Sequence, residues 1–137
     1  MTAGYSGTPL AAKLGINDGT RCLLVGAPHI EQLQPPPSAT VHRRKGSGSY
    51  DVIVVFARDL AELERRFAPL IDSLATAGGL WACWPKKASG VPTDLDDNVV
   101  RAHGLSTGLV DVKVAAIDST WSGQKFVRRL KDRQPTR

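Results

Sequence analysis

Apolar and polar residues follow one another along this chain in blocks that predict strands and helices in turn. Three blocks, residues 21–25, 50–56 and 80–84, are almost wholly apolar, which is typical of central strands buried on both faces. A fourth block, residues 40–43, alternates apolar and polar side chains and suits an outer strand. Strands that alternate with helical segments predict an α/β protein.

The clearest helical pattern begins at Asp59. Asp59 and Glu62 have the spacing of a capping box, which closes the first turn of a helix. Apolar residues then recur every three or four positions, so one face of this helix is expected to pack on the sheet. That face consists of Leu60, Leu63, Phe67, Leu70, Ile71 and Leu74, and Glu62, Glu64, Arg65 and Arg66 lie mostly off it.

Glycines mark the ends of two predicted helices. Gly78 and Gly79 close the crossover before the third central strand. A second helix is expected to begin with Thr93 or Asp94 as its cap and to end at Gly104. Both helices therefore join strands, as a parallel sheet requires.

A short helix is predicted near the N-terminus, over residues 10–14. Thr8 is its expected cap, and Gly15 is its expected end. Residues 4–7 precede it as an arm that either closes over the strand ends, packs against a second subunit or is disordered.

Two strands are predicted after the last helix, at residues 112–117 and 125–129. The segment between them is too short for a crossover helix, so they are expected to form an antiparallel hairpin. The fold predicted is a three-layer, Rossmann-like α/β domain with a mainly parallel sheet closed by this hairpin. The expected strand order is 40–43, 21–25, 50–56, 80–84 and then the hairpin.

Cys22 and Cys83 fall inside apolar strands, where a thiol is usually a small buried side chain. The expected strand order separates them by one strand, about 10 Å at the spacing of a sheet, which is beyond the reach of a disulfide. Two cysteines without a CxxC spacing do not indicate a metal site.

The length of 137 residues, with 42% hydrophobic and 23% charged residues, predicts a single domain over residues 1–137. No apolar run approaches the roughly 18 residues that a membrane span needs. The N-terminus has no secretory signal pattern, and we expect a cytoplasmic protein without a membrane partner.

The net charge of +5 resides near the C-terminus, because residues 124–137 carry six positive side chains and one negative side chain. Residues 131–137 contain no apolar anchor and are expected to form a flexible basic tail. Aromatic residues are not interleaved with the basic ones, so nucleic-acid binding is kept only as an alternative.

The succession of strand, long helix, strand, helix and hairpin over residues 50–130 resembles the second half of the class I methyltransferases. The resemblance implies a fold that binds S-adenosylmethionine beyond its first strand, through a Gly-x-Gly-x-Gly loop. Here that strand ends in Gly26-Ala27-Pro28, and an acidic residue for the cofactor ribose is missing from the next strand. We therefore predict no cofactor, and S-adenosylmethionine only under the alternative of a methyltransferase-like enzyme.

Three separated blocks, residues 4–15, 84–90 and 118–123, are similar to a family of small bacterial proteins. The family is common in actinobacteria and is known only as a domain of unknown function. The resemblance therefore implies a bacterial protein and supplies no activity.

The main candidate site follows the third central strand. Lys86 and Lys87 leave that strand beside Ser89, Gly90 and the helix start expected at Thr93. Ammonium groups, a hydroxyl and the free N–H groups of a helix start suit a phosphate or a carboxylate. The alternative is that the lysines are simply solvated and that Ser89 and Gly90 turn the chain.

Trp121 and Ser122 are added to this candidate site because their turn lies near the same strand end. A tryptophan in a turn either covers a neighbouring strand end, anchors a partner chain or packs back on its own domain. Asp118, Ser119 and Ser122 form a polar set that suits closure of the turn by side-chain to backbone bonds.

The sequence thus favours a non-enzymatic binding or regulatory protein with a small anionic ligand or a protein partner at residues 86–93. A homodimer is left open. No catalytic or metal-ligating residue is predicted, since His29, His42 and His103 lie in separate segments without a nucleophile motif.

Overall fold

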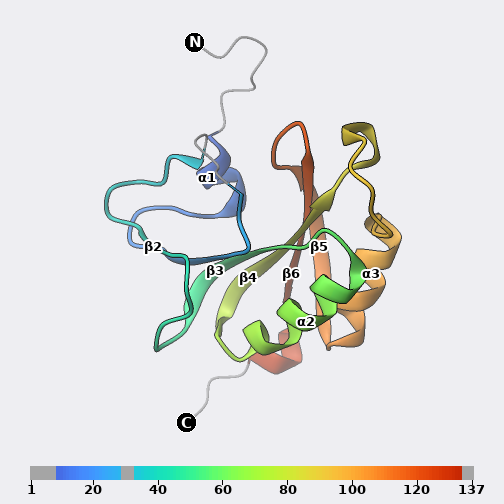
Figure 1. The fold of residues 1–137 in the computed structure, drawn as a ribbon. Helices are drawn as coiled ribbons and strands as arrows, with labels where there is room; N and C mark the ends of the chain where they lie inside the picture. The colour runs from blue at the N-terminus through green and yellow to red at the C-terminus, as the bar shows by residue number, and fades with distance from the viewer. Residues whose placement is uncertain (1–8, 29–32, 134–137) are drawn as a thin grey trace.

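Six strands form one mixed sheet in the computed structural model, which describes residues 9–28 and 33–133. Their order is β2-β1-β3-β4-β6-β5 (Figure 1). The first four pair in parallel, and β6 runs antiparallel to both β4 and β5. This confirms the predicted fold class and strand order. The bounds are β1 Arg21–Val25, β2 Thr40–His42, β3 Tyr50–Phe56, β4 Leu74–Pro85, β5 Leu109–Ala116 and β6 Trp121–Arg128.

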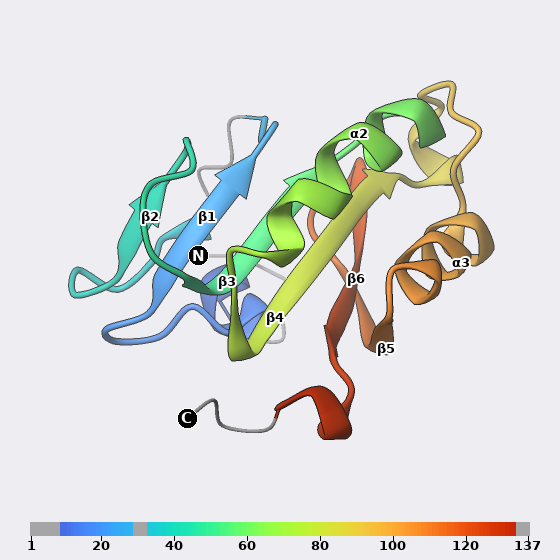
Figure 2. The same cartoon turned by 90° about the horizontal axis from the view of Figure 1, so that it is seen from below.

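Helices cover both faces of the sheet. Helices α2 and α3 lie together on one face, which is turned toward the viewer in Figure 2, and α1 lies on the other face. Alternate strand residues point to opposite faces, so Ile53 packs in the core beneath α2 and α3, whereas Val54 packs in the core beneath α1. The predicted three layers are therefore present. The helices are α1 Leu10–Leu14, α2 Leu60–Ile71 and α3 Asp97–Ser106, with short 3-10 helices η2 at Lys87–Ser89 and η3 at Leu130–Arg133.

Cys22 on β1 and Cys83 on β4 are both buried and free, with β3 between their strands, as predicted. Burial raises the pKa of the Cys22 thiol to about 12. Burial and the nearby Asp118 carboxylate raise the pKa of Cys83 even further. Both thiols therefore stay protonated near neutral pH and act as core side chains.

The helix after β3 is shorter than predicted. Leu74 belongs to β4 rather than to α2, and Gly78 and Gly79 lie inside the strand instead of before it. Leu74 pairs with Tyr50, and an irregular register follows before Gly79 pairs with Val52. The apolar spacing was correct, but pairing with the start of β3 draws Leu74 into the sheet.

Both predicted bounds of α3 are wrong. Asp96, instead of Thr93 or Asp94, caps the helix and accepts a hydrogen bond from the backbone N–H of Val99 at 2.8 Å. The helix also continues through Gly104, which is buried in the turn that faces β6. A Cβ at this position would overlap the ring of Phe126, so this glycine allows close packing rather than ending the helix.

The C-terminal hairpin is confirmed, but its strands are longer than predicted. Trp121 is the first residue of β6 instead of a turn residue, and it pairs with Pro85 of β4. The carboxylate of Asp118 accepts hydrogen bonds from the backbone N–H groups of Thr120 and Trp121, each at 2.8 Å, so it closes the turn as expected.

The two ends of the chain are described in part. Gly15 ends α1 with a φ of 90°, as predicted, whereas the expected Thr8 cap and the arm over residues 4–7 lie outside the described residues. Residues 131–133 belong to η3, and residues 134–137 lie outside the described part, so the flexible tail stays a prediction. Within residues 9–28 and 33–133, no helix has both the length and the apolar character to cross a membrane.

Candidate functional site

The carboxyl ends of β1, β3 and β4 meet at one edge of the sheet. From β1 the chain continues to β2 on one side, while β3 lies on the other side of β1. Such a reversal of strand order is where open α/β sheets bind ligands, because the connections on the two sides diverge and leave a crevice. Any cavity at this point is the first place to seek a site.

A cavity of about 290 Å³ lies there, and we call it the arginine cavity. Its residues come from the ends of β1 and β3, from α2 and from the start of β6. Trp121 is thus part of this cavity, and its ring packs against Phe56 of the same domain. The lining consists of Gly26, Pro28, Phe56, Arg58, Glu62, Arg66 and Trp121.

Glu62 organises the charges of the cavity. Its carboxylate lies 3.2 Å from Arg66 and 3.7 Å from both Arg58 and Arg65. It also accepts a hydrogen bond from the backbone N–H of Arg58 at 2.8 Å, and its own N–H donates to the Asp59 side chain. Of these groups, Arg58, Arg66 and Glu62 line the cavity, so its wall carries two positive charges and one negative charge, which favours an anion.

Arg66 is held in place from two sides. Besides its ion pair with Glu62, it donates a hydrogen bond to the carbonyl oxygen of Phe56 at 2.6 Å. Its guanidinium also occupies the space that a Cβ would need at Gly26, whose φ is 68°. The residue after β1 is therefore covered by an arginine, and a larger residue there would be strained at this φ and would have to move the Arg66 guanidinium.

Aromatic rings form the apolar part of the cavity. The rings of Phe56 and Trp121 meet edge to face, with their centroids 5.1 Å apart. Phe56 is buried and Trp121 is half-buried, so both rings have fixed neighbours. The arginine cavity thus combines donors for an anion with a firm apolar wall.

Sequence reasoning missed Arg58, Glu62 and Arg66 as site residues. The pattern placed Glu62 and Arg66 off the apolar face of the helix, which is correct, but residues off that face can still turn toward the end of the sheet. The capping-box spacing of Asp59 and Glu62 was the available signal, since it fixes a carboxylate at the start of α2.

Part of the predicted site does come together. Lys86 donates its backbone N–H to the carbonyl oxygen of Thr120 at 2.9 Å, and Ser122 pairs with Trp84. Lys86, Trp121 and Ser122 therefore lie near one another at the carboxyl end of β4. Only Trp121 of these three lines the arginine cavity.

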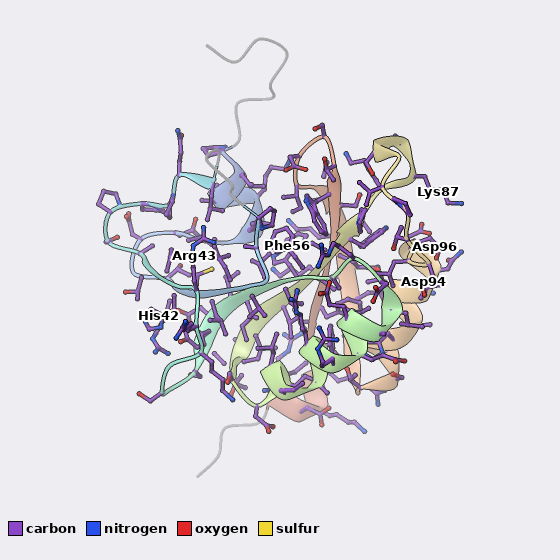
Figure 3. The ribbon with its side chains drawn as sticks, in the orientation of Figure 1. His42, Arg43, Phe56, Lys87, Asp94 and Asp96 are labelled. Atoms are coloured by element: carbon purple, nitrogen blue, oxygen red, sulfur yellow. The ribbon has the colours of Figure 1, made fainter. Side chains whose placement is uncertain are left out.

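The other predicted residues, Lys87, Ser89, Gly90 and Thr93, follow Lys86 in the segment 86–93, which we call the lysine loop. The Ser89 hydroxyl donates to the carbonyl oxygen of Lys86 at 2.6 Å, and the Thr93 hydroxyl accepts from the N–H of Leu95 at 3.0 Å. Gly90 turns the chain with a φ of 77°, and Lys87 points outward (Figure 3). The hydroxyls thus hold the loop's own backbone.

Carboxylates already occupy the helix ends beside the lysine loop. Asp96 binds the first turn of α3, and Asp94 accepts a hydrogen bond from the backbone N–H of Leu60 in α2 at 2.8 Å. The helix start expected at Thr93 is therefore absent, and negative charge lies at these N-termini. An anion site at Lys86 and Lys87 stays a prediction without the helix end that motivated it.

Comparison with solved structures identifies the type of fold. No protein-family model matches the chain, and no curated protein sequence matches it. Among solved structures, magnesium protoporphyrin IX methyltransferase from Synechocystis PCC 6803 with bound SAH is similar, with a TM-score of 0.57 and 11% identity. The similarity covers 88% of this chain and 78% of that one. The chain has a methyltransferase-like fold.

A second solved structure supports the same assignment of fold. A SAM-dependent methyltransferase from Aquifex aeolicus has a TM-score of 0.53 and 11% identity, over 84% of this chain and 85% of the other. Identities this low show the shared fold alone. In this methyltransferase-like fold, the arginine cavity lies beyond β1 and β3, with Arg66 over Gly26.

Proposed function

We propose that the chain is a non-enzymatic binding or regulatory protein that takes a small anionic ligand in the arginine cavity. The observation that carries this proposal is the pairing of Arg58 and Arg66 with the Phe56 and Trp121 rings around one cavity. The function is the one that the sequence favoured. The site differs from the one that the sequence indicated, because we place it in the arginine cavity beyond β1 and β3 and not in the lysine loop.

The ligand we propose is a carboxylate or phosphate attached to a flat apolar group. Guanidinium groups bind such oxyanions with two parallel hydrogen bonds, and the rings supply area for an apolar part. A volume of about 290 Å³ is at the lower end of ligand pockets, which run from roughly 300 to 1,000 Å³, so the ligand is small.

A direct test is calorimetry with benzoate, phenyl phosphate and inorganic phosphate on the full chain. Arg58→Ala should weaken binding of the aromatic anion about tenfold, because one charged hydrogen bond is lost. Arg65→Ala is the matched control, since Arg65 also pairs with Glu62 but does not line the cavity. Equal losses in the two variants, or no binding by the wild type, would contradict the proposal.

The alternative is a methyltransferase-like enzyme, and only the fold favours it. Calorimetry with S-adenosylmethionine should show no heat, because Arg66 covers Gly26. The positive charge of the arginines around Glu62 would also repel the cationic sulfonium of this cofactor. Binding of S-adenosylmethionine that Gly26→Ala removes would reverse this ranking.

Two narrower ideas accompany the proposal. One is membership in the actinobacterial family of small proteins, which rests on the three sequence blocks.

The other is nucleic-acid binding through residues 131–137. Such binding should fall steeply with salt and disappear when the tail is removed. The arginine cavity supports neither idea.

A further inference from the structure

Lys113 and Lys125 form a pair on the face of the sheet that carries α1. They lie directly opposite each other on β5 and β6. Like charges in opposed positions of neighbouring strands destabilise a sheet, unless something offsets their repulsion. Neither lysine forms an ion pair within residues 9–28 and 33–133.

The carboxylate closest to this pair in sequence faces the other way. Asp111 lies opposite Phe126, whose ring packs in the core beneath α2 and α3. Its carboxylate forms an ion pair with Arg101 at 3.2 Å on that side of the sheet. The paired lysines therefore have no neutralising acid from Asp111.

Lys125 is set into the sheet surface. Gly79 lacks a side chain, and the stem of Lys125 occupies the space above it, so a Cβ at Gly79 would overlap the lysine. Trp81 lies in the same row, and the Lys113 ammonium is 5.9 Å from the centroid of its ring. The half-buried Lys125 thus lies on an apolar floor, while the exposed Lys113 stands over the tryptophan.

Two effects favour the neutral form of the Lys125 amine. Burial lowers the pKa of Lys125, and the positive charge of Lys113 lowers it further. A lysine amine is a nucleophile only when it is neutral, and desolvation beside a second cation is one way in which proteins produce that state. The same second cation is a natural partner for the carboxylate of an incoming molecule.

We infer that Lys125 is a reactive amine that forms an imine with a small 2-oxo acid, whose carboxylate is held by Lys113. The Lys125 nitrogen adds to the ketone carbon, and the resulting carbinolamine loses water. Both amine protons leave with the carbonyl oxygen as that water, and a carbon–nitrogen double bond remains. This site is separate from the arginine cavity and does not depend on the function proposed there.

The test traps the imine on the full chain with pyruvate and sodium cyanoborohydride, followed by peptide mass spectrometry of every lysine. We expect modification of Lys125 to exceed that of Lys86, Lys87 and Lys131 severalfold. Equal modification of Lys125 and these other lysines would overturn the inference.

Lys113→Gln tests the second amine, with Lys87→Gln as its matched control. Modification of Lys125 should fall severalfold in Lys113→Gln and stay unchanged in Lys87→Gln. A second measurement uses the wild type alone and compares pyruvate with acetone, which has no carboxylate. The preference for Lys125 should be larger with pyruvate, and an equal preference would refute the role of Lys113.

Discussion

The arginine cavity and the lysine loop lie at the same edge of the sheet, and both carry positive charge, but they are built differently. In the cavity, Glu62 of α2 and the Phe56 carbonyl of β3 hold the Arg66 guanidinium. In the lysine loop, the hydroxyls of Ser89 and Thr93 bind the loop's own backbone, and Lys87 points outward. Arg66 is thus fixed by its own helix and by a carbonyl from another element, whereas within the described residues no hydrogen bond or ion pair fixes the side chain of Lys86 or Lys87.

The difference concerns preorganisation. A cation that is already fixed loses little freedom when an anion binds, whereas a solvated lysine must be ordered at that moment. Residue type alone therefore does not rank two anion sites. The ranking depends on which segments of the fold converge on the charged groups.

The largest expected effect comes from Glu62→Ala, which removes the carboxylate at the centre of the cavity. We expect the free energy of unfolding to fall by about 2 kcal/mol, since a mostly buried ion pair and a bond to a helix start are both lost. Urea unfolding measures this, together with loss of ligand binding.

Two variants accompany this measurement. Glu64→Ala, on the exposed side of α2, should stay within about 0.5 kcal/mol of the wild type. Glu62→Gln should lie between wild type and Glu62→Ala, because its side-chain oxygen still accepts the N–H of Arg58. If the Glu62→Ala protein were as stable as Glu64→Ala, Glu62 would not hold the arginines in place. The arginine cavity would then be no better ordered than the lysine loop.

A smaller effect is expected from a pair of glycine variants, one in each region. Gly26→Ala and Gly90→Ala both place a side chain at positive φ, 68° and 77°, which costs about 1 kcal/mol or more. Only at Gly26 does the new Cβ also displace Arg66, while nothing lies within 4 Å of it at Gly90. Gly26→Ala should therefore be the less stable protein and the only one that loses ligand binding.

Thermal unfolding measures the stability of both glycine variants, and calorimetry measures their ligand binding. Equal destabilisation with intact ligand binding in both proteins would mean that Arg66 is free to move. In that case the cations of the arginine cavity would be no better ordered for anion binding than those of the lysine loop.

The smallest expected effect is that of Ser89→Ala. The variant loses hydrogen bonds to Lys86 and Val91 within the loop, so we expect a loss of about 1 kcal/mol in unfolding free energy. Ligand affinity measured by calorimetry should not change. A clear loss of affinity in this variant would make the lysine loop the binding site.

The sequence predicted the sheet well because its signals are local. Apolar runs identify β1, β3 and β4, and the short link before Trp121 requires a hairpin. Bounds that depend on tertiary contact were wrong. Gly104 was expected to end α3, yet the ring of Phe126, more than one element away, is what requires a glycine there.

The candidate site was harder to predict for the same reason. Trp121 was named as a candidate residue but was placed in a turn, whereas it begins β6 and lines a cavity beyond β1 and β3. Arg58 and Arg66 each stand four residues from Glu62, so these ion pairs follow from local spacing. Only folding adds the Phe56 carbonyl to Arg66 and closes the cavity with Trp121. Local spacing therefore indicated both the capping box at Glu62 and its arginine partners, but it carried no information on which side of the sheet this cluster would face.

The position of Trp121 makes its intrinsic fluorescence a probe of the arginine cavity. Trp81 is 0% exposed and Trp84 is 5% exposed, whereas Trp121 is half-buried at the wall of the arginine cavity. Dissolved quenchers such as iodide should therefore reach one indole far more readily than the other two. A molecule that enters the cavity would shield that indole, and its arrival could be followed as a change in quenching without any attached dye.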